Sequence, residues 1–119
     1  MSKAKLTSAE KAAKLVQYAD DMKADRIEQI NVQSKTPIAD YFVVCSGTSD
    51  VHVNAILDKV REKLVEDGVR PLRQDTQGAG WVLLDYGDVV FHVMREEKRQ
   101  FYDLEALWTN LQPNPDLLS

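Results

Sequence analysis

The feature that most constrains this chain is the stretch Trp81–Met94, which predicts two apolar strands joined by a tight turn at Tyr86-Gly87. Gly87 can adopt the positive φ that such a turn requires. Side chains along a strand alternate between two faces, and residues 89–94 are apolar on both faces apart from His92. One face can pack on the protein's own core, whereas the other needs a covering helix or a partner. This surplus of apolar surface is the main functional clue in the chain.

The composition predicts a soluble cytoplasmic protein. The chain has 119 residues, of which 44% are hydrophobic and 29% are charged, as in ordinary globular domains. No apolar run approaches the roughly 20 residues that span a bilayer, and no apolar signal core follows the first residues. The single cysteine, Cys45, cannot form an internal disulfide, which fits a reducing compartment.

The charge is distributed unevenly along the sequence. Residues 1–73 carry 12 Lys and Arg against 11 Asp and Glu, whereas residues 74–119 carry 3 against 8. An acidic second half repels phosphate backbones, so the sequence disfavours direct nucleic-acid binding as the main activity. An acidic and apolar surface is better suited to a basic protein partner.

Three helices are expected. The first covers about residues 8–23 and begins with a capping box, in which Thr7 and Glu10 satisfy each other's amides. The second begins after the Ser46–Asp50 turn and ends at Gly68, a natural residue to follow a helix. The third begins at Glu96, and its apolar stripe consists of Phe101, Leu104, Leu107, Trp108 and Leu111.

Five strands complete the expected fold. Besides the hairpin they are residues 25–32, the apolar run 38–45 and a short edge strand 69–73, followed by a polar loop over 74–80. The order of elements predicts a mixed α/β fold with a roughly five-stranded sheet flanked by helices. Residues 1–111 are expected to form a single domain, and residues 112–119 a disordered tail.

The turn Ser46–Asp50 is the one place where an enzyme site is conceivable. Small residues at a helix N-terminus can hold phosphate, and the layout resembles the Gly-Ser turn of nucleotidyltransferases. Those enzymes need paired carboxylates on the next strand to bind Mg²⁺, but the expected next strand, Val69–Arg73, carries arginines. A helix cap is therefore favoured over catalysis, and no catalytic residue is predicted.

The remaining polar residues also favour structural roles. Asp85 and Asp88 flank the hairpin turn, where Asp is a common residue. His52 and His92 are not part of any metal-ligand spacing, so neither a metal nor another cofactor is expected. Cys45 lies in an apolar strand without a neighbouring base, which favours core packing over nucleophilic chemistry.

Four hairpin residues are of the kind that protein interfaces enrich: Trp81, Tyr86, His92 and Met94. Leu83 and Phe91 already supply the core from this hairpin. Two interpretations stay open, because these four residues either face a partner or lie beneath the last helix.

The chain resembles the ribosomal silencing factor S family, also called Iojap-like. The resemblance covers about residues 8–110. It rests on the segment Asp40–Asp50, the pair His52-Val53, the hairpin Trp81–Met94 and the segment Phe101–Trp108. One departure is Val51, where relatives often carry arginine, and this leaves open whether the start of the second helix contacts anything.

The resemblance implies a fold and a function. The family has a nucleotidyltransferase-like fold without the metal-binding acids. Its members bind the large ribosomal subunit through the fourteenth protein of that subunit and block joining of the small subunit, and they form homodimers. The partner-facing positions implied for this sequence are Trp81, Asp85, Tyr86, Asp88, Met94 and Tyr102.

These considerations lead to one hypothesis and two rivals. We expect a non-enzymatic translational repressor in which Trp81→Ala or Tyr86→Ala weakens partner binding and leaves the fold intact. The rivals are a nucleotidyltransferase, which titration with nucleotide and Mg²⁺ would detect, and a dimeric scaffold unconnected with the ribosome.

Overall fold

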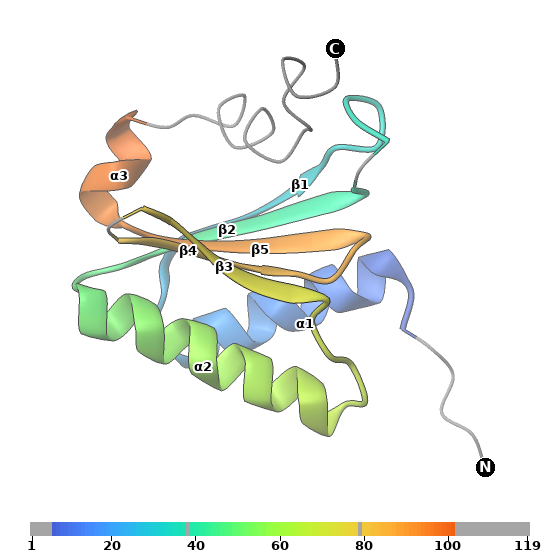
Figure 1. The fold of residues 1–119 in the computed structure, drawn as a ribbon, viewed down its shortest axis with the longest axis horizontal. Coiled ribbons are helices and arrows are strands. Elements are labelled where there is room, and N and C mark those ends of the chain that lie inside the picture. The colour runs from blue at the N-terminus through green and yellow to red at the C-terminus, as the bar shows by residue number, and fades with distance from the viewer. Residues whose placement is uncertain (1–5, 38, 79, 102–119) are drawn as a thin grey trace.

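A computed structural model describes residues 6–37, 39–78 and 80–101 of the chain. Its centre is a five-stranded sheet, and the two long helices lie together on one side of that sheet (Figure 1). The elements in chain order are α1 (Ser8–Asp21), β1 (Asp25–Asn31), β2 (Tyr41–Gly47), α2 (Asp50–Glu66), β3 (Arg73–Gly78), β4 (Trp81–Asp85), β5 (Val89–Arg95) and α3 (Glu96–Phe101).

The strand order in space is β1-β2-β5-β4-β3. The central pair β2 and β5 is parallel, and the other three pairs are antiparallel. The hairpin predicted from Trp81–Met94 therefore supplies β4 and β5, two of the three inner strands. The expected mixed sheet flanked by helices is confirmed, and the apolar run that forms β2 is an inner strand, which fits its burial on both faces.

The expected position of the third strand is wrong. The sequence predicted a strand over 69–73 and a loop over 74–80, whereas β3 begins at Arg73 and pairs with β4, Gln74 opposite Leu84 and Thr76 opposite Val82. The physical reason is that an edge strand needs only backbone pairing on one side and tolerates polar side chains on its exposed surface. Pro71 lacks an amide hydrogen and precedes the ladder.

Both long helices begin at predicted caps. The Thr7 hydroxyl accepts from the Glu10 amide at 3.1 Å, and the Glu10 carboxylate accepts from the Thr7 amide at 2.8 Å. The Ser49 hydroxyl accepts from the His52 amide at the start of α2. After α2 the chain reverses at Gly68, whose φ of +87° is the left-handed conformation that favours glycine.

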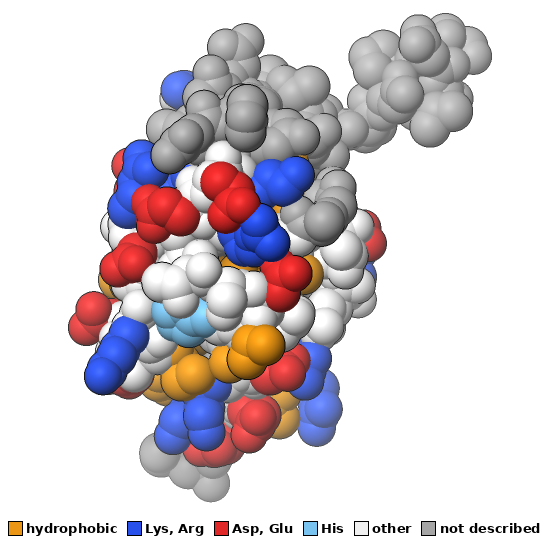
Figure 2. All heavy atoms as spheres, turned by 90° about the vertical axis from the view of Figure 1, so that its left-hand side faces the viewer, with side chains coloured by type: hydrophobic (Ala, Val, Ile, Leu, Met, Phe, Trp, Pro, Cys, Tyr) orange, Lys and Arg blue, Asp and Glu red, His pale blue; other side chains and the backbone are white. Residues whose placement is uncertain are grey.

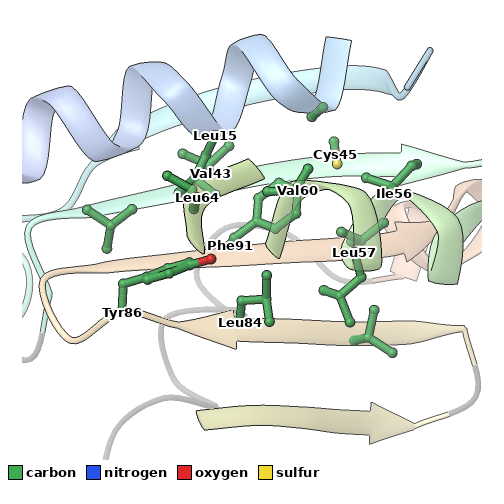
Figure 3. Packing of buried hydrophobic residues seen from close by; sticks show 14 of the residues in the cluster. Leu15, Val43, Cys45, Ile56, Leu57, Val60, Leu64, Leu84, Tyr86 and Phe91 are labelled. Carbon is green, nitrogen blue, oxygen red and sulfur yellow. The ribbon is translucent and has the colours of Figure 1, made fainter. Parts of the chain in front are cut away.

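The sheet buries apolar side chains on both of its faces. On the helix-covered face, β2, β4 and β5 pack against α1 and α2, and Phe91 lies among Leu15, Val60 and Leu64 (Figure 3). The opposite face, called the second face below, carries a separate cluster. Its members are Val32, Ala39, Phe42, Val44, Trp81, Leu83, Val90 and Met94, with Ile30 packed beside them.

Two expectations concern residues that the structure does not describe. From Leu104 onward, the apolar stripe predicted for the last helix lies outside the described residues, and so does the tail 112–119. Tyr102, one of the implied partner-facing residues, also lies outside them.

Candidate interaction surface

Trp81 and Met94 lie on the second face of the sheet. They are directly opposite each other in the antiparallel register of β4 and β5. Trp81 is only 3% exposed and Met94 is fully buried. The hairpin places these two of the six implied partner-facing residues side by side, but in this structure both side chains are buried.

Trp81 forms a buried pair with His92. The indole Nε1 donates to His92 Nδ1 at 3.0 Å, and Phe42 meets the other side of the imidazole ring edge-on at a centroid distance of 5.5 Å. Because Nδ1 accepts, the ring proton of the neutral imidazole is assigned to Nε2. Burial, helped by the charge of Arg73, lowers the pKa of His92 to about 3, so the imidazole is neutral near pH 7.

His92 Nε2 is buried and has no hydrogen-bond partner. A donor left in this state typically costs about 1–3 kcal/mol, so it is unusual in a well-packed interior. Strand alternation places Trp81 and His92 on the same face, and the register, in which His92 lies opposite Leu83, makes them diagonal neighbours. The missing acceptor could not be predicted.

Tyr86 lies on the opposite face from Trp81. It is 5% exposed and belongs to the helix-covered cluster, where its ring extends alongside Phe91 beneath α2 (Figure 3). Burial raises the pKa of Tyr86 above the ordinary tyrosine value, and its hydroxyl has no partner. The alternation of β4 explains this position, since Tyr86 keeps the parity of Val82 and Leu84.

This burial corrects one expectation. Trp81 and Tyr86 do not share a surface, and neither is an exposed anchor that can be truncated freely. Removing a buried aromatic side chain typically costs about 3–5 kcal/mol. We therefore expect Trp81→Ala and Tyr86→Ala to destabilise the fold, whatever they do to partner binding.

The two acids of the hairpin turn form ion pairs and hydrogen bonds within the chain, which agrees with the structural roles predicted for them. Asp85 accepts from Arg73 Nε at 3.1 Å and from the Gly87 amide at 2.8 Å. Asp88 pairs with Lys11 of α1 at 2.9 Å, and its carbonyl accepts from the Asp40 and Tyr41 amides. The two carboxylates keep 22% and 34% of their side-chain surface exposed, so each can still receive a further donor.

The Ser46–Asp50 turn is a helix cap. The Thr48 amide donates to His52 Nδ1 at 2.9 Å, and the other ring nitrogen, Nε2, lies 2.9 Å from the Met22 carbonyl at the end of α1. His52 thus joins the start of α2 to the end of α1. The amides of Thr48 and His52, which a phosphate would need, already donate to side chains at the start of α2.

The surface around this turn is mixed in charge. Figure 2 shows acidic and basic side chains interspersed over this end of the molecule, with a small apolar area beside a histidine. Val51, the residue that departs from the family resemblance, is 80% exposed here. Arg95 pairs with Asp50 and Glu97, so two acids bind the one arginine.

Arg99 is an important residue that the sequence did not reveal. It lies in α3, yet its side chain is only 5% exposed. Nη1 donates to the Arg26 carbonyl and to Ser46 Oγ, both at 2.9 Å, and Nη2 donates to Glu28 at 2.6 Å. One arginine therefore fixes α3 against β1 and β2. Nothing in the pattern Glu-Glu-Lys-Arg distinguishes it from a solvated charge.

Two further observations concern chemistry. Burial raises the pKa of Cys45 to about 12, which keeps the thiol protonated and unreactive near neutral pH. Within residues 6–37, 39–78 and 80–101, no three His, Cys, Asp or Glu side chains come together as metal ligands, and no helix is long and apolar enough to cross a membrane.

Comparison with known proteins places the chain in a sequence family. Residues 5–118 match the family described as "Ribosomal silencing factor during starvation". The chain is 38% identical over 94 residues to ribosomal silencing factor RsfS of Halalkalibacterium halodurans, covering 78% of this chain and 80% of that protein. The RsfS of Bacillus subtilis is 38% identical over 90 residues, covering 75% and 76%.

More distant relatives and a solved structure agree with this match. The chloroplastic protein Iojap of Zea mays is 30% identical over 102 residues, which are 86% of this chain and 45% of that protein. A crystal structure of a Chromobacterium violaceum protein has a TM-score of 0.80 and 32% identity, covering 92% of both chains.

Proposed function

Since the chain belongs to the family of ribosomal silencing factors that act during starvation, we propose that it binds the large ribosomal subunit and sterically blocks joining of the small subunit. The docking partner in this proposal is a basic ribosomal protein, the fourteenth of the large subunit. The observation that carries the proposal is the family match over residues 5–118. Translation is reduced because a subunit occupied by this protein cannot form a complete ribosome.

Steric exclusion requires a docking surface and no reaction. The geometry supports such a mechanism, because the turn that could have held a phosphate is capped by its own side chains. The relatives at 30–38% identity are named ribosomal silencing factors and an Iojap protein. We therefore propose a non-enzymatic activity with no cofactor.

We propose that the β4–β5 hairpin is the docking surface. The partly exposed carboxylates of Asp85 and Asp88 lie at its turn, and the second-face residues Trp81 and Met94 pair at its opposite end. Carboxylates at the rim attract a basic partner and orient it, whereas an aromatic anchor supplies most of the binding energy. Tyr102 stays part of the proposed surface, although it lies outside the described residues.

Gradient sedimentation tests the proposed activity directly. Purified large subunits are run with this protein, with and without small subunits. We expect the protein to migrate with large subunits and the peak of joined ribosomes to shrink in proportion. If the protein stays at the top of the gradient, the proposed function is wrong.

Charge-neutralising variants test the docking surface without removing a buried ring. Asp85→Asn and Asp88→Asn keep the side-chain shape and should weaken binding to large subunits by roughly 2–5-fold each, the usual effect of a rim charge. The matched control is Asp58→Asn, which neutralises an exposed acid on α2 that pairs with Arg61 away from the hairpin. Equal effects at all three positions would indicate a loss of general charge attraction and would contradict the assignment.

Three further points belong to the same proposal. We propose that the free protein is a homodimer, that it acts in the cytoplasm and that it makes little direct contact with nucleic acid. Sedimentation velocity at several concentrations measures the first point. Salt dependence measures the third, because extensive phosphate contacts would give a steep loss of affinity with salt.

A further inference from the structure

A charged trio, formed by Arg73, Asp75 and Asp85, borders the second face of the sheet. Arg73 Nη1 donates to Asp75 Oδ2 at 2.8 Å, and Arg73 Nε donates to Asp85 Oδ2 at 3.1 Å. One arginine therefore binds two carboxylates, so that one positive charge stands against two negative charges. The docking surface proposed above includes Asp85 but neither Arg73 nor Asp75.

The register of the sheet places the charged trio on the same face as Trp81. In the β3–β4 pair, Arg73 lies opposite Asp85, and Asp75 lies opposite Leu83. Asp85 and Leu83 have the strand parity of Trp81, and both Leu83 and Trp81 belong to the second-face cluster. The trio is thus the charged border of the apolar face that contributes Trp81 to the proposed docking surface.

The arginine of the trio can be reached from outside, although its charge acts on the buried centre of the second face. Burial is the first cause that lowers the pKa of His92, and the charge of Arg73 lowers it further. The Arg73 side chain is nevertheless 47% exposed, whereas Lys11, the cation that pairs with Asp88 at the hairpin turn, is only 19% exposed. Because exposed ion pairs contribute little free energy, a cation from outside can displace Arg73 from its acids.

We propose that Arg73 is a specificity-determining residue of the docking surface, an internal counter-cation that occupies Asp75 and Asp85 until a correctly placed basic group of the partner displaces it. The inference rests on the proposed function, in which the partner is basic, and it adds Asp75 to the docking surface. A basic group that approaches either carboxylate meets the positive charge of Arg73 and must replace the bond that Arg73 makes. Cations at other positions gain little from these acids, because Arg73 already compensates part of their charge.

The counter-cation explains how an acidic and apolar hairpin avoids binding every basic segment. Without the charge of Arg73, two carboxylates on this face would attract any cationic chain. Specificity is a difference between affinities, and a repulsive element lowers the affinity most for partners that cannot displace it. Arg73 therefore lowers the affinity for basic chains in general more than the affinity for the proper partner.

Replacing the arginine by a neutral residue tests this role. Arg73→Gln removes the charge that compensates both acids, so binding to large subunits should tighten by roughly 2–5-fold, the usual effect of a rim charge. A residue that only supports the fold would give unchanged or weaker binding when it is replaced, so the direction of the change distinguishes the two roles. Arg73→Lys restores the charge and should remove most of the gain.

The matched control is Arg61→Gln. Arg61 also pairs with an acid, Asp58, but it lies on α2, which packs on the other face of the sheet. The control removes the same charge from the chain and therefore measures the effect of net charge alone. No tightening by Arg73→Gln, or equal tightening by both variants, would overturn the proposal.

Circular dichroism and thermal unfolding verify that each variant is folded. If Arg73→Gln does not fold, Arg73→Met replaces it, because methionine keeps an unbranched stem of similar length and also lacks the charge. The same binding measurements then apply.

A hexalysine peptide separates this proposal from the proposed function. If the unmodified chain does not bind large subunits, the proposed function is wrong, and the peptide then decides the role of Arg73 without a ribosome. By calorimetric titration, Arg73→Gln should bind hexalysine roughly 2–5-fold more tightly than Arg61→Gln, and the difference should vanish in high salt. Equal affinities of the two variants for hexalysine would overturn the role of Arg73 in that case.

Discussion

The two faces of the sheet are buried to a similar degree but by different means. The helix-covered face packs against two helices of 14 and 17 residues, which both begin at well-formed caps. The second face carries an aromatic and histidine pair. Among the described residues it has on its side the six-residue α3 and the β1–β2 connection, which supplies Val32 and Ala39. Within the part of the chain that the structure describes, each face holds one buried side-chain polar atom without a hydrogen-bond partner, Tyr86 Oη on the first and His92 Nε2 on the second.

This difference bears on how easily each face can open. A face covered by long helices is opened only by unfolding, because the helices are themselves part of the cooperative core. A face on which no long helix packs among the described residues is expected to open locally at a lower free energy. The hairpin serves both faces, which explains why its sequence is apolar on both sides.

The largest effect on stability is expected from truncating Phe91 and Phe42, one buried phenylalanine on each face. Phe91→Ala removes the ring beneath α1 and α2 and should lower the free energy of unfolding by about 3–5 kcal/mol. Phe42→Ala on the second face should cost less, at or below the lower end of that range, because no long helix among the described residues packs on that face and its side chains can shift into the cavity more easily. Urea denaturation of both variants measures the difference. Equal costs would indicate that the two faces are equally rigid.

A second prediction uses the histidine of the second face. The folded pKa of His92 is about 3 and its unfolded value about 6.5, so the unfolded chain binds the extra proton. The contribution of His92 to stability is complete above pH 6.5 and is lost as the pH falls towards 3. Between pH 7 and pH 5 this amounts to about 2 kcal/mol.

The check is to measure stability at pH 7 and pH 5 for the parent and for His92→Phe. His92→Phe should lack the pH dependence of stability that comes from His92. The Asp and Glu residues should contribute equally to the pH dependence of both proteins. If the pH dependence of the two proteins is identical, His92 is accessible to protons in the folded state and the second face is open.

A smaller effect on stability is expected at the hairpin turn. Asp88→Asn removes the ion pair with Lys11, whose partners are partly exposed, and should cost no more than about 1 kcal/mol. Lys11→Met removes the same pair from the other side. A double-mutant cycle by thermal denaturation isolates the coupling, which should shrink in high salt.

The smallest effect is predicted for the orphaned hydroxyl of the helix-covered face. Tyr86→Phe removes an oxygen that has no hydrogen-bond partner, so stability should be unchanged or slightly higher. Melting temperature measures this. If the variant is less stable by more than about 1 kcal/mol, the hydroxyl has a partner in solution, and the helix-covered face is less closed than the structure indicates.

Much of the fold was determined by local sequence signals. The capping residues Thr7 and Ser49, the glycine after α2 and the alternation in Trp81–Met94 each specify a local geometry through neighbours within a few residues. β3 could not be located in this way. Its polar side chains carry no strand signal, and its conformation comes from backbone pairing with β4.

The proposed docking surface was determined less well by sequence. Interface-like residues could be recognised by type, but whether Trp81 or Tyr86 is covered depends on which helix lies over which face. Strand parity placed these two residues on opposite sides, so one lies beneath α2 and the other beside His92. Arg99 shows the same limit, since its burial depends on a β1 backbone that lies some seventy residues earlier.

The sequence by itself determined the family, the mixed sheet and the apolar hairpin, because these depend on residue order and short-range geometry. Only the tertiary structure decided which hairpin residues are accessible, which acids are already paired, and where a buried nitrogen lacks an acceptor. Burial and hydrogen bonding are properties of segments that meet in space. Shifting a strand by one residue, or placing a helix over the other face, would reverse each of these outcomes while the local sequence patterns stayed the same.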